Sequence, residues 1–89
     1  MIWHVFFNGR AEKQFLRLGE AEQKKVRALA KALEIMGPVQ GGWPNYSKLG
    51  KGEHHCHLGY RYVMVWKVVD KSARMIEVTY VGSREKAPY

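Results

Sequence analysis

Residues 60–69 read Tyr-Arg-Tyr-Val-Met-Val-Trp-Lys-Val-Val, a stretch dominated by aromatic and β-branched side chains. These residue types favour extended structure, and successive side chains of a strand point to opposite faces of a sheet. The stretch therefore predicts a long strand with two distinct faces. One face, which we place in the core, carries Tyr62, Met64, Trp66 and Val68, and the other carries Arg61, Val63, Val65 and Lys67.

Two shorter strands are expected beside this one. Residues 54–58 predict a strand that ends at Gly59, and residues 75–81 predict a last strand after a hairpin turn at 70–72. In the last strand, alternation places Ile76, Val78 and Tyr80 on one face and Glu77 and Thr79 on the other.

The first half of the chain predicts a strand followed by two helices. Residues 3–7 suit a short buried strand before the Asn8-Gly9 break. Residues 11–35 are rich in helix-forming residues, and the interruption at 18–20 divides them into two helices. The second helix is expected to bury the face with Val26, Leu29, Ala30, Leu33 and Met36. Gly37-Pro38 ends that helix, and the glycine-rich residues 39–52 predict a loop.

This order of elements predicts one α+β domain spanning residues 1–89. We expect two layers, a helical hairpin packed on one face of a mostly antiparallel four-stranded sheet, in the order β-α-α-β-β-β. The opposite face is expected to carry the polar residues, with His55, His57 and Arg61 close to the glycine-rich loop and to the basic tail at 82–89.

Composition restricts the partners. The 89 residues include 15 Lys and Arg against 8 Asp and Glu, a formal net charge of +7, and 46% are hydrophobic. A folded domain with this charge suits nucleic acid, an anionic membrane or an acidic protein. No stretch approaches the roughly 20 apolar residues of a membrane-spanning helix, and no amphipathic segment is free of the core, so we expect no membrane partner. The single Cys56 excludes an internal disulfide, so we expect a cytoplasmic protein.

The residues that carry chemistry are two histidines and their basic neighbours. RNA cleavage through its own 2′-hydroxyl needs a base, an acid and cations for the phosphate, without a cofactor. His55 and His57 share a strand face, and the pKa of free histidine, about 6.5, allows either proton-transfer role. Arg61, Arg84 and Tyr89 complete the candidate catalytic set. Candidate RNA-binding residues are Lys48, Lys51, Lys86, Trp43 and Tyr46.

The run His54-His55-Cys56-His57 also consists of zinc-ligand residue types. Adjacent strand residues point to opposite faces, so only alternate members could share an ion, with Glu53, His4 or Glu77 completing the site. No second paired cluster follows, and we expect no metal site.

Several segments together resemble the RelE/ParE superfamily of bacterial type II toxins, across nearly the whole chain. They are Leu18-Gly19, Lys48-Leu49, Gly59-Tyr60-Arg61 and the closing residues Tyr80-Val81-Gly82-Ser83-Arg84-Glu85. His55-Cys56-His57 followed by Tyr62-Val63-x-x-Trp66 resembles the subgroup described as cytotoxic translational repressors.

The resemblance implies a toxin held inactive by a cognate acidic antitoxin, and in the RelE branch an endoribonuclease that cuts mRNA on the ribosome. By position, the roles of that branch fall on His55, His57, Arg61, Arg84 and Tyr89. RelE has lysines on the second strand where this chain has histidines, and it carries a further helix after the position of Tyr89. Two alternatives remain: a ParE-like inhibitor of DNA gyrase without catalytic residues, and a degenerate toxin fold that acts as a binding module.

Overall fold

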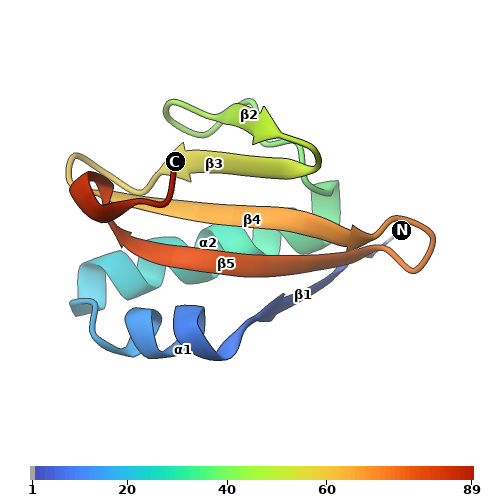
Figure 1. Ribbon diagram of the computed structural model, residues 1–89. Helices are drawn as coiled ribbons and strands as arrows, with labels where there is room; N and C mark the ends of the chain where they lie inside the picture. The colour runs from blue at the N-terminus through green and yellow to red at the C-terminus, as the bar shows by residue number, and fades with distance from the viewer. Residues whose placement is uncertain (1) are drawn as a thin grey trace.

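The computed structural model describes residues 2–89 as two helices and five strands (Figure 1). The elements are β1 (His4–Phe7), α1 (Gly9–Leu16), α2 (Glu20–Met36), β2 (Ser47–Gly50), β3 (Glu53–His57), β4 (Tyr62–Asp70), β5 (Met75–Ser83) and the 3-10 turn η1 (Arg84–Lys86). The strands form a single sheet in the order β1-β5-β4-β3-β2, in which β1 pairs parallel with β5 and every other pairing is antiparallel. The α+β class and the mostly antiparallel sheet are confirmed.

The sheet has five strands, so the expected count of four was wrong. The additional strand, β2, lies inside residues 39–52, which the sequence predicted as a loop. It pairs with β3 through Ser47 and His55 and through Lys48 and His54, with an irregularity before Gly50. A four-residue strand with glycine at its end has no alternation of its own, and pairing with β3 is what makes it extended.

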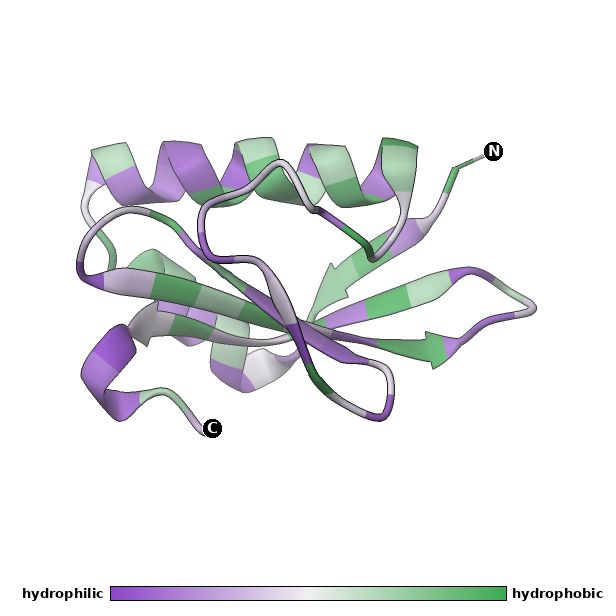
Figure 2. Cartoon of the chain, turned by 90° about the horizontal axis from the view of Figure 1, so that it is seen from above, coloured by the Kyte–Doolittle hydropathy of each residue, from purple (hydrophilic) through white to green (hydrophobic). Residues whose placement is uncertain are grey.

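The two helices cover different parts of the sheet. Asn8 caps α1, since its Oδ1 accepts a hydrogen bond from Ala11 N at 2.8 Å. Helix α1 lies along β5 beyond the end of β1, where Gln14 Oε1 accepts a hydrogen bond from Val81 N at 3.0 Å. Helix α2 runs across one face of the sheet and buries Val26, Leu29 and Leu33 (Figure 2).

The end of α2 departs from the expected buried face. Met36 was expected to be buried, but it is 65% exposed because the helix stops there. Gly37 follows with φ of +88°, which favours glycine, and a Cβ at this position would lie 2.9 Å from the Trp3 indole nitrogen. The glycine therefore ends the helix and lets Trp3 pack closely.

The core lies between α2 and the sheet face that carries Met64 and Trp66, as the alternation of residues 60–69 predicts. In β5 the predicted alternation fails. Trp66 pairs with Val78 but Val65 pairs with Tyr80, so Thr79 is an extra residue in a β-bulge. Tyr80 therefore lies on the opposite face from Ile76 and Val78, and its expected place beside them was wrong.

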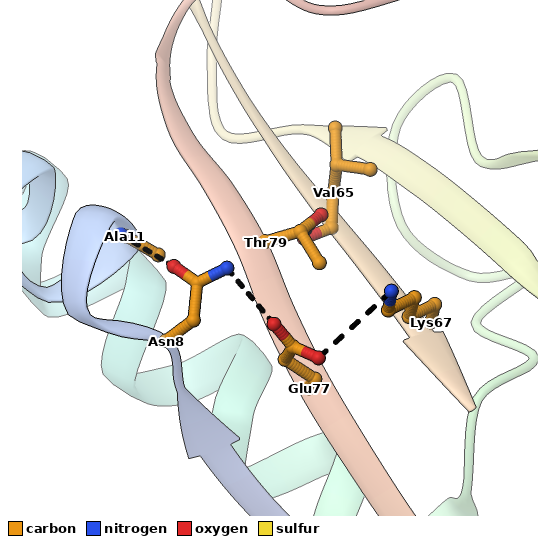
Figure 3. A network of polar contacts seen from close by, with 6 residues as sticks. All are labelled: Asn8, Ala11, Val65, Lys67, Glu77 and Thr79. Atoms are coloured by element: carbon orange, nitrogen blue, oxygen red, sulfur yellow. Dashed lines mark hydrogen bonds and ion pairs between the residues drawn. The ribbon is translucent and has the colours of Figure 1, made fainter. Parts of the chain in front are cut away.

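A polar network surrounds the bulge (Figure 3). Thr79 Oγ1 donates a hydrogen bond to Val65 O at 3.4 Å. Glu77 accepts a hydrogen bond from Asn8 Nδ2 at 2.9 Å and lies 4.0 Å from Lys67 Nζ. These contacts attach the start of α1 to β5 and β4.

The face opposite α2 was expected to be polar, but it holds a second apolar cluster of Val63, Val65 and Tyr80, with Leu49 and Ala87 packed against it. Ala87 belongs to the C-terminal tail, which crosses this face toward β3 (Figures 1 and 2). Within the described residues, neither helix combines the length and the hydropathy that a bilayer-spanning segment requires.

Candidate functional site

His55 and His57 lie on the sheet face that is opposite α2. They pair across β3 and β4 with Val65 and Val63, which belong to the second apolar cluster. Their ring centroids are 5.8 Å apart. His55 is buried, with 8% exposure, and His57 is half-buried. The expectation that both rings share the face opposite the helices is correct.

The segment before β3 holds both imidazoles. Ser47 Oγ and His55 Nδ1 share a hydrogen bond of 3.1 Å, and Asn45 Nδ2 donates to His57 Nδ1 at 3.1 Å. The backbone is attached as well, because His57 N donates to Pro44 O at 2.8 Å. Asn45 has φ of +53°, a left-handed conformation that asparagine adopts more readily than most residues. Sequence reasoning missed both side chains, although Pro44-Asn45 is a turn signal.

Tyr89 reaches the site from the end of the tail. Its ring centroid lies 4.6 Å from that of His55. Two hydrogen bonds shape the approach of the tail: Tyr80 Oη donates to Ser83 O at 2.7 Å, and Lys86 N donates to Ser83 Oγ at 3.2 Å. Ala87 then packs on the second apolar cluster. The bulge that turns Tyr80 to this face therefore helps to bring Tyr89 to His55.

The two arginines lie beside each other at one end of the sheet. Arg84 N donates to Arg61 O at 2.7 Å, which joins the end of β5 to the segment before β4. Both arginines are exposed. They line an open pocket of about 540 Å³ together with Tyr60, Tyr62, Ser83 and Glu85. We call this the arginine pocket.

Arg84 influences the pKa values of both His57 and Tyr89, so the arginine pocket acts electrostatically on the histidine face. Burial lowers the pKa of His57 most, and electrostatic interactions with His55 and Arg84 lower it further. His57 is therefore neutral at pH 7. Tyr89 is 54% exposed, and the burial of the rest of the side chain raises its pKa, although Arg84 acts in the opposite direction. Tyr89 therefore keeps its phenolic proton at neutral pH.

The structure does not bring all the candidate RNA-binding residues to this face. Trp43 and Tyr46 pack against the main core, and Tyr46 Oη lies 2.6 Å from His54 Nδ1 in a hydrogen bond. Lys48 pairs with His54 and therefore shares the helical side of the sheet. Burial of His54 lowers the pKa of its imidazole most, and the charge of Lys48 lowers it further. Lys51 lies in the turn between β2 and β3, and Lys86 lies in η1, beside the arginine pocket.

The cluster at 54–57 is divided between the two faces of the sheet. His54 stacks on Trp66 with 6.0 Å between ring centroids, and Cys56 is fully buried in the main core. Burial raises the pKa of the Cys56 thiol to about 12, which keeps it protonated. Within residues 2–89, no group of three His, Cys, Asp or Glu side chains is placed to hold a metal ion.

Comparison with known proteins relates this architecture to solved toxin structures. No protein-family model and no curated protein sequence matches the chain. The archaeal RelE–RelB complex of Pyrococcus horikoshii contains a chain similar over 98% of this chain and 100% of its own, with 16% identity and a TM-score of 0.76. The DinJ–YafQ toxin–antitoxin complex of E. coli gives 14% identity over 100% of both chains, with a TM-score of 0.75.

The YoeB dimer of Staphylococcus aureus is similar as well, with 17% identity, a TM-score of 0.75, and coverage of 94% of this chain and 99% of YoeB. All three similarities extend over 94% or more of this chain. The chain therefore has the fold of the RelE-like toxins.

Proposed function

We propose that this protein is the toxin of a toxin–antitoxin pair and acts as a metal-independent endoribonuclease on mRNA, including mRNA bound to the ribosome. One observation carries the proposal. A histidine whose pKa is lowered, His57, lies on one sheet face with His55 and Tyr89, within the electrostatic influence of Arg84. A base, an acid and a cation are the groups that cleavage through the 2′-hydroxyl requires.

In this proposal His57 is the base. It takes the proton of the 2′-hydroxyl while the 2′-oxygen attacks the adjacent phosphorus. The neutral ring needs its lone pair on Nε2 for this step. The amide of Asn45, which now donates to Nδ1, must therefore turn and present Oδ1 to a proton on Nδ1. Asn45 thereby selects the tautomer of the base.

Tyr89 is the acid. As the bond from phosphorus to the 5′-oxygen breaks, the phenol gives its proton to that oxygen, which leaves a 2′,3′-cyclic phosphate and a 5′-hydroxyl. Arg61 and Arg84 bind the non-bridging phosphate oxygens, because a guanidinium matches two oxygens at once. His55 supports the Tyr89 ring, which it contacts directly.

A cognate acidic antitoxin is part of the proposal. The solved structures of similar fold include complexes with the antitoxins RelB and DinJ. The net charge of +7 favours an acidic partner as much as it favours RNA. A disordered acidic segment of the antitoxin that folds over the arginine pocket would block the access of RNA to Arg61 and Arg84. The gyrase-inhibitor alternative gains no support from the structures reported above.

The test is controlled expression in bacteria, with transcript ends mapped after induction. We expect the wild type to arrest growth and cut mRNA, and Arg61→Ala and Arg84→Ala to do neither. Arg10→Ala, which removes an exposed arginine from α1, is the matched control and should behave like the wild type. Toxicity that survives both substitutions, with intact transcripts and accumulating DNA breaks, would contradict the nuclease function. A wild type without any toxicity would favour a binding module.

A further inference from the structure

Tyr60 is the most exposed large aromatic side chain at the arginine pocket, with 82% of its surface accessible. Exposure of this degree contributes little to the stability of a fold, since an apolar ring stabilises by being buried. Tyr62, two residues later, is half-buried against the core. The position of Tyr60 therefore calls for a role other than packing.

The backbone presents Tyr60 at the tip of a turn. Leu58 N donates to Tyr62 O at 2.8 Å, which closes the turn between β3 and β4 around residues 59–61. Gly59 has φ of +140°, a conformation that only glycine adopts easily. A Cβ at Gly59 would also lie 3.0 Å from Lys25 Nζ on α2. The turn is thus shaped by Gly59, and a cation approaches it from the helical side.

The ring of Tyr60 is already in contact with the proposed phosphate-binding group. The guanidinium carbon of Arg84 lies 5.5 Å from the ring centroid, a cation–π arrangement. One nucleotide carries a phosphate and a planar base, and Arg84 and Tyr60 offer a partner for each. The pocket of about 540 Å³ lies within the range of roughly 300–1,000 Å³ that small-molecule sites occupy.

We infer that Tyr60 is a stacking platform for a base of single-stranded RNA, next to the phosphate held by Arg61 and Arg84. Aromatic rings bind unpaired bases by stacking in many RNA-binding proteins, and this is tolerant of base identity. This inference rests on the proposed function and adds to it a binding residue outside the proton-transfer groups. Tyr60 contacts substrate without moving a proton.

The test measures the equilibrium binding of the protein to short single-stranded RNA. The RNA carries 2′-O-methyl groups, which prevent cleavage, and it is offered both free and bound to ribosomes. We expect Tyr60→Ala to weaken binding roughly 5- to 150-fold, the range that stacking of one base supports. Tyr60→Phe keeps the ring and should bind like the wild type. Leu16→Ala, which shortens an exposed apolar side chain on α1, is the control. All variants should keep the unfolding midpoint of the wild type.

An abasic site moved along the RNA identifies the stacked base. At one position it should weaken binding by the wild type and have no further effect on Tyr60→Ala. If wild type and Tyr60→Ala bind equally, or if every abasic RNA loses the same affinity for both, the stacking role is wrong. Failure of the nuclease function has a different signature, because the wild type then neither binds RNA nor cuts it, and the stacking role falls with it.

Discussion

The phenol ring of Tyr89 lies against the imidazole of His55, with 4.6 Å between the ring centroids and 51° between the planes. This contact joins the C-terminal tail to β3 on the face opposite α2. It places a phenol whose pKa is raised by partial burial beside a pair of histidines. The proposed division of labour between acid and base depends on it.

Two substitutions of Tyr89 distinguish the role of its hydroxyl group from the role of its ring. Tyr89→Phe should lower single-turnover RNA cleavage by about 10²-fold, because the acid is lost while the contact with His55 remains. Tyr89→Ala should cleave no faster and should also leave His55 more exposed. Arg10→Ala, which removes an exposed arginine from α1, is the control and should cleave at the wild-type rate. Full activity of Tyr89→Phe would move the acid role to His55.

The titration of His57 should respond to its neighbours. In an NMR titration we expect the pKa of His57 below the ordinary value of about 6.5. Arg84→Ala and His55→Ala should each raise it, because each removes an electrostatic interaction that disfavours the imidazolium of His57. Asn45→Asp should raise it further, because a carboxylate favours the charged ring and a proton on Nδ1. A His57 pKa that is unchanged in all three variants would contradict this electrostatic account.

The same groups make the fold sensitive to acid. The pKa values of His54 and His57 are lowered in the folded state, so between those values and about 6.5 the unfolded chain binds more protons. The free energy of unfolding should therefore be constant above about pH 6.5 with respect to these groups and fall as the pH drops below it. Denaturant titrations across this window measure the change.

His54 contributes to that acid sensitivity through its buried stack on Trp66. His54→Phe keeps a ring in the stack and removes the titrating group, so the pH dependence of the unfolding free energy should become shallower. Stability at neutral pH should fall by about 1 kcal/mol, because Tyr46 loses its hydrogen-bond partner.

Cleavage should not depend on a divalent metal ion. His54 and Cys56 point away from His55 and His57, so the four side chains cannot surround one ion. Excess EDTA should leave the cleavage rate of the purified protein unchanged within about twofold, in contrast to enzymes that use a metal-bound water. Loss of activity in EDTA that returns with one added metal would revive a metal-dependent mechanism.

Strong local patterns made much of the fold predictable. The alternation at 60–69 located β4 and the face that packs under α2 correctly, and the composition of 11–35 located both helices. The errors came from features that tertiary contacts determine. Strand β2 is extended because β3 offers it a partner, and Tyr80 changes face because Thr79 forms a bulge.

The residues of the candidate site also fall into two groups, those that local sequence patterns predicted and those that tertiary structure brings to the site. His55 and His57 could be placed together because strand alternation is local. Arg84 and Tyr89 could be placed near them because the tail follows β5, which is separated from β3 by β4 alone. Asn45 and Tyr60 could not, since turn conformations bring them to the site. Ser47 could not either, because it reaches His55 through the pairing of β2 with β3, and β2 was not expected. Trp43 and Tyr46 come from the same loop, and they pack on the core instead.

The most direct measurement uses purified protein and an mRNA that carries a single 2′-deoxynucleotide at the mapped cleavage position, free and on programmed ribosomes. Attack by the 2′-oxygen predicts that unmodified RNA gives 2′,3′-cyclic phosphate and 5′-hydroxyl ends. It also predicts that the deoxy substitution abolishes the cut and that His57→Ala slows cleavage of unmodified RNA by about 10²-fold. Cleavage that persists at the deoxynucleotide, or that leaves 3′-hydroxyl and 5′-phosphate ends, would contradict the account.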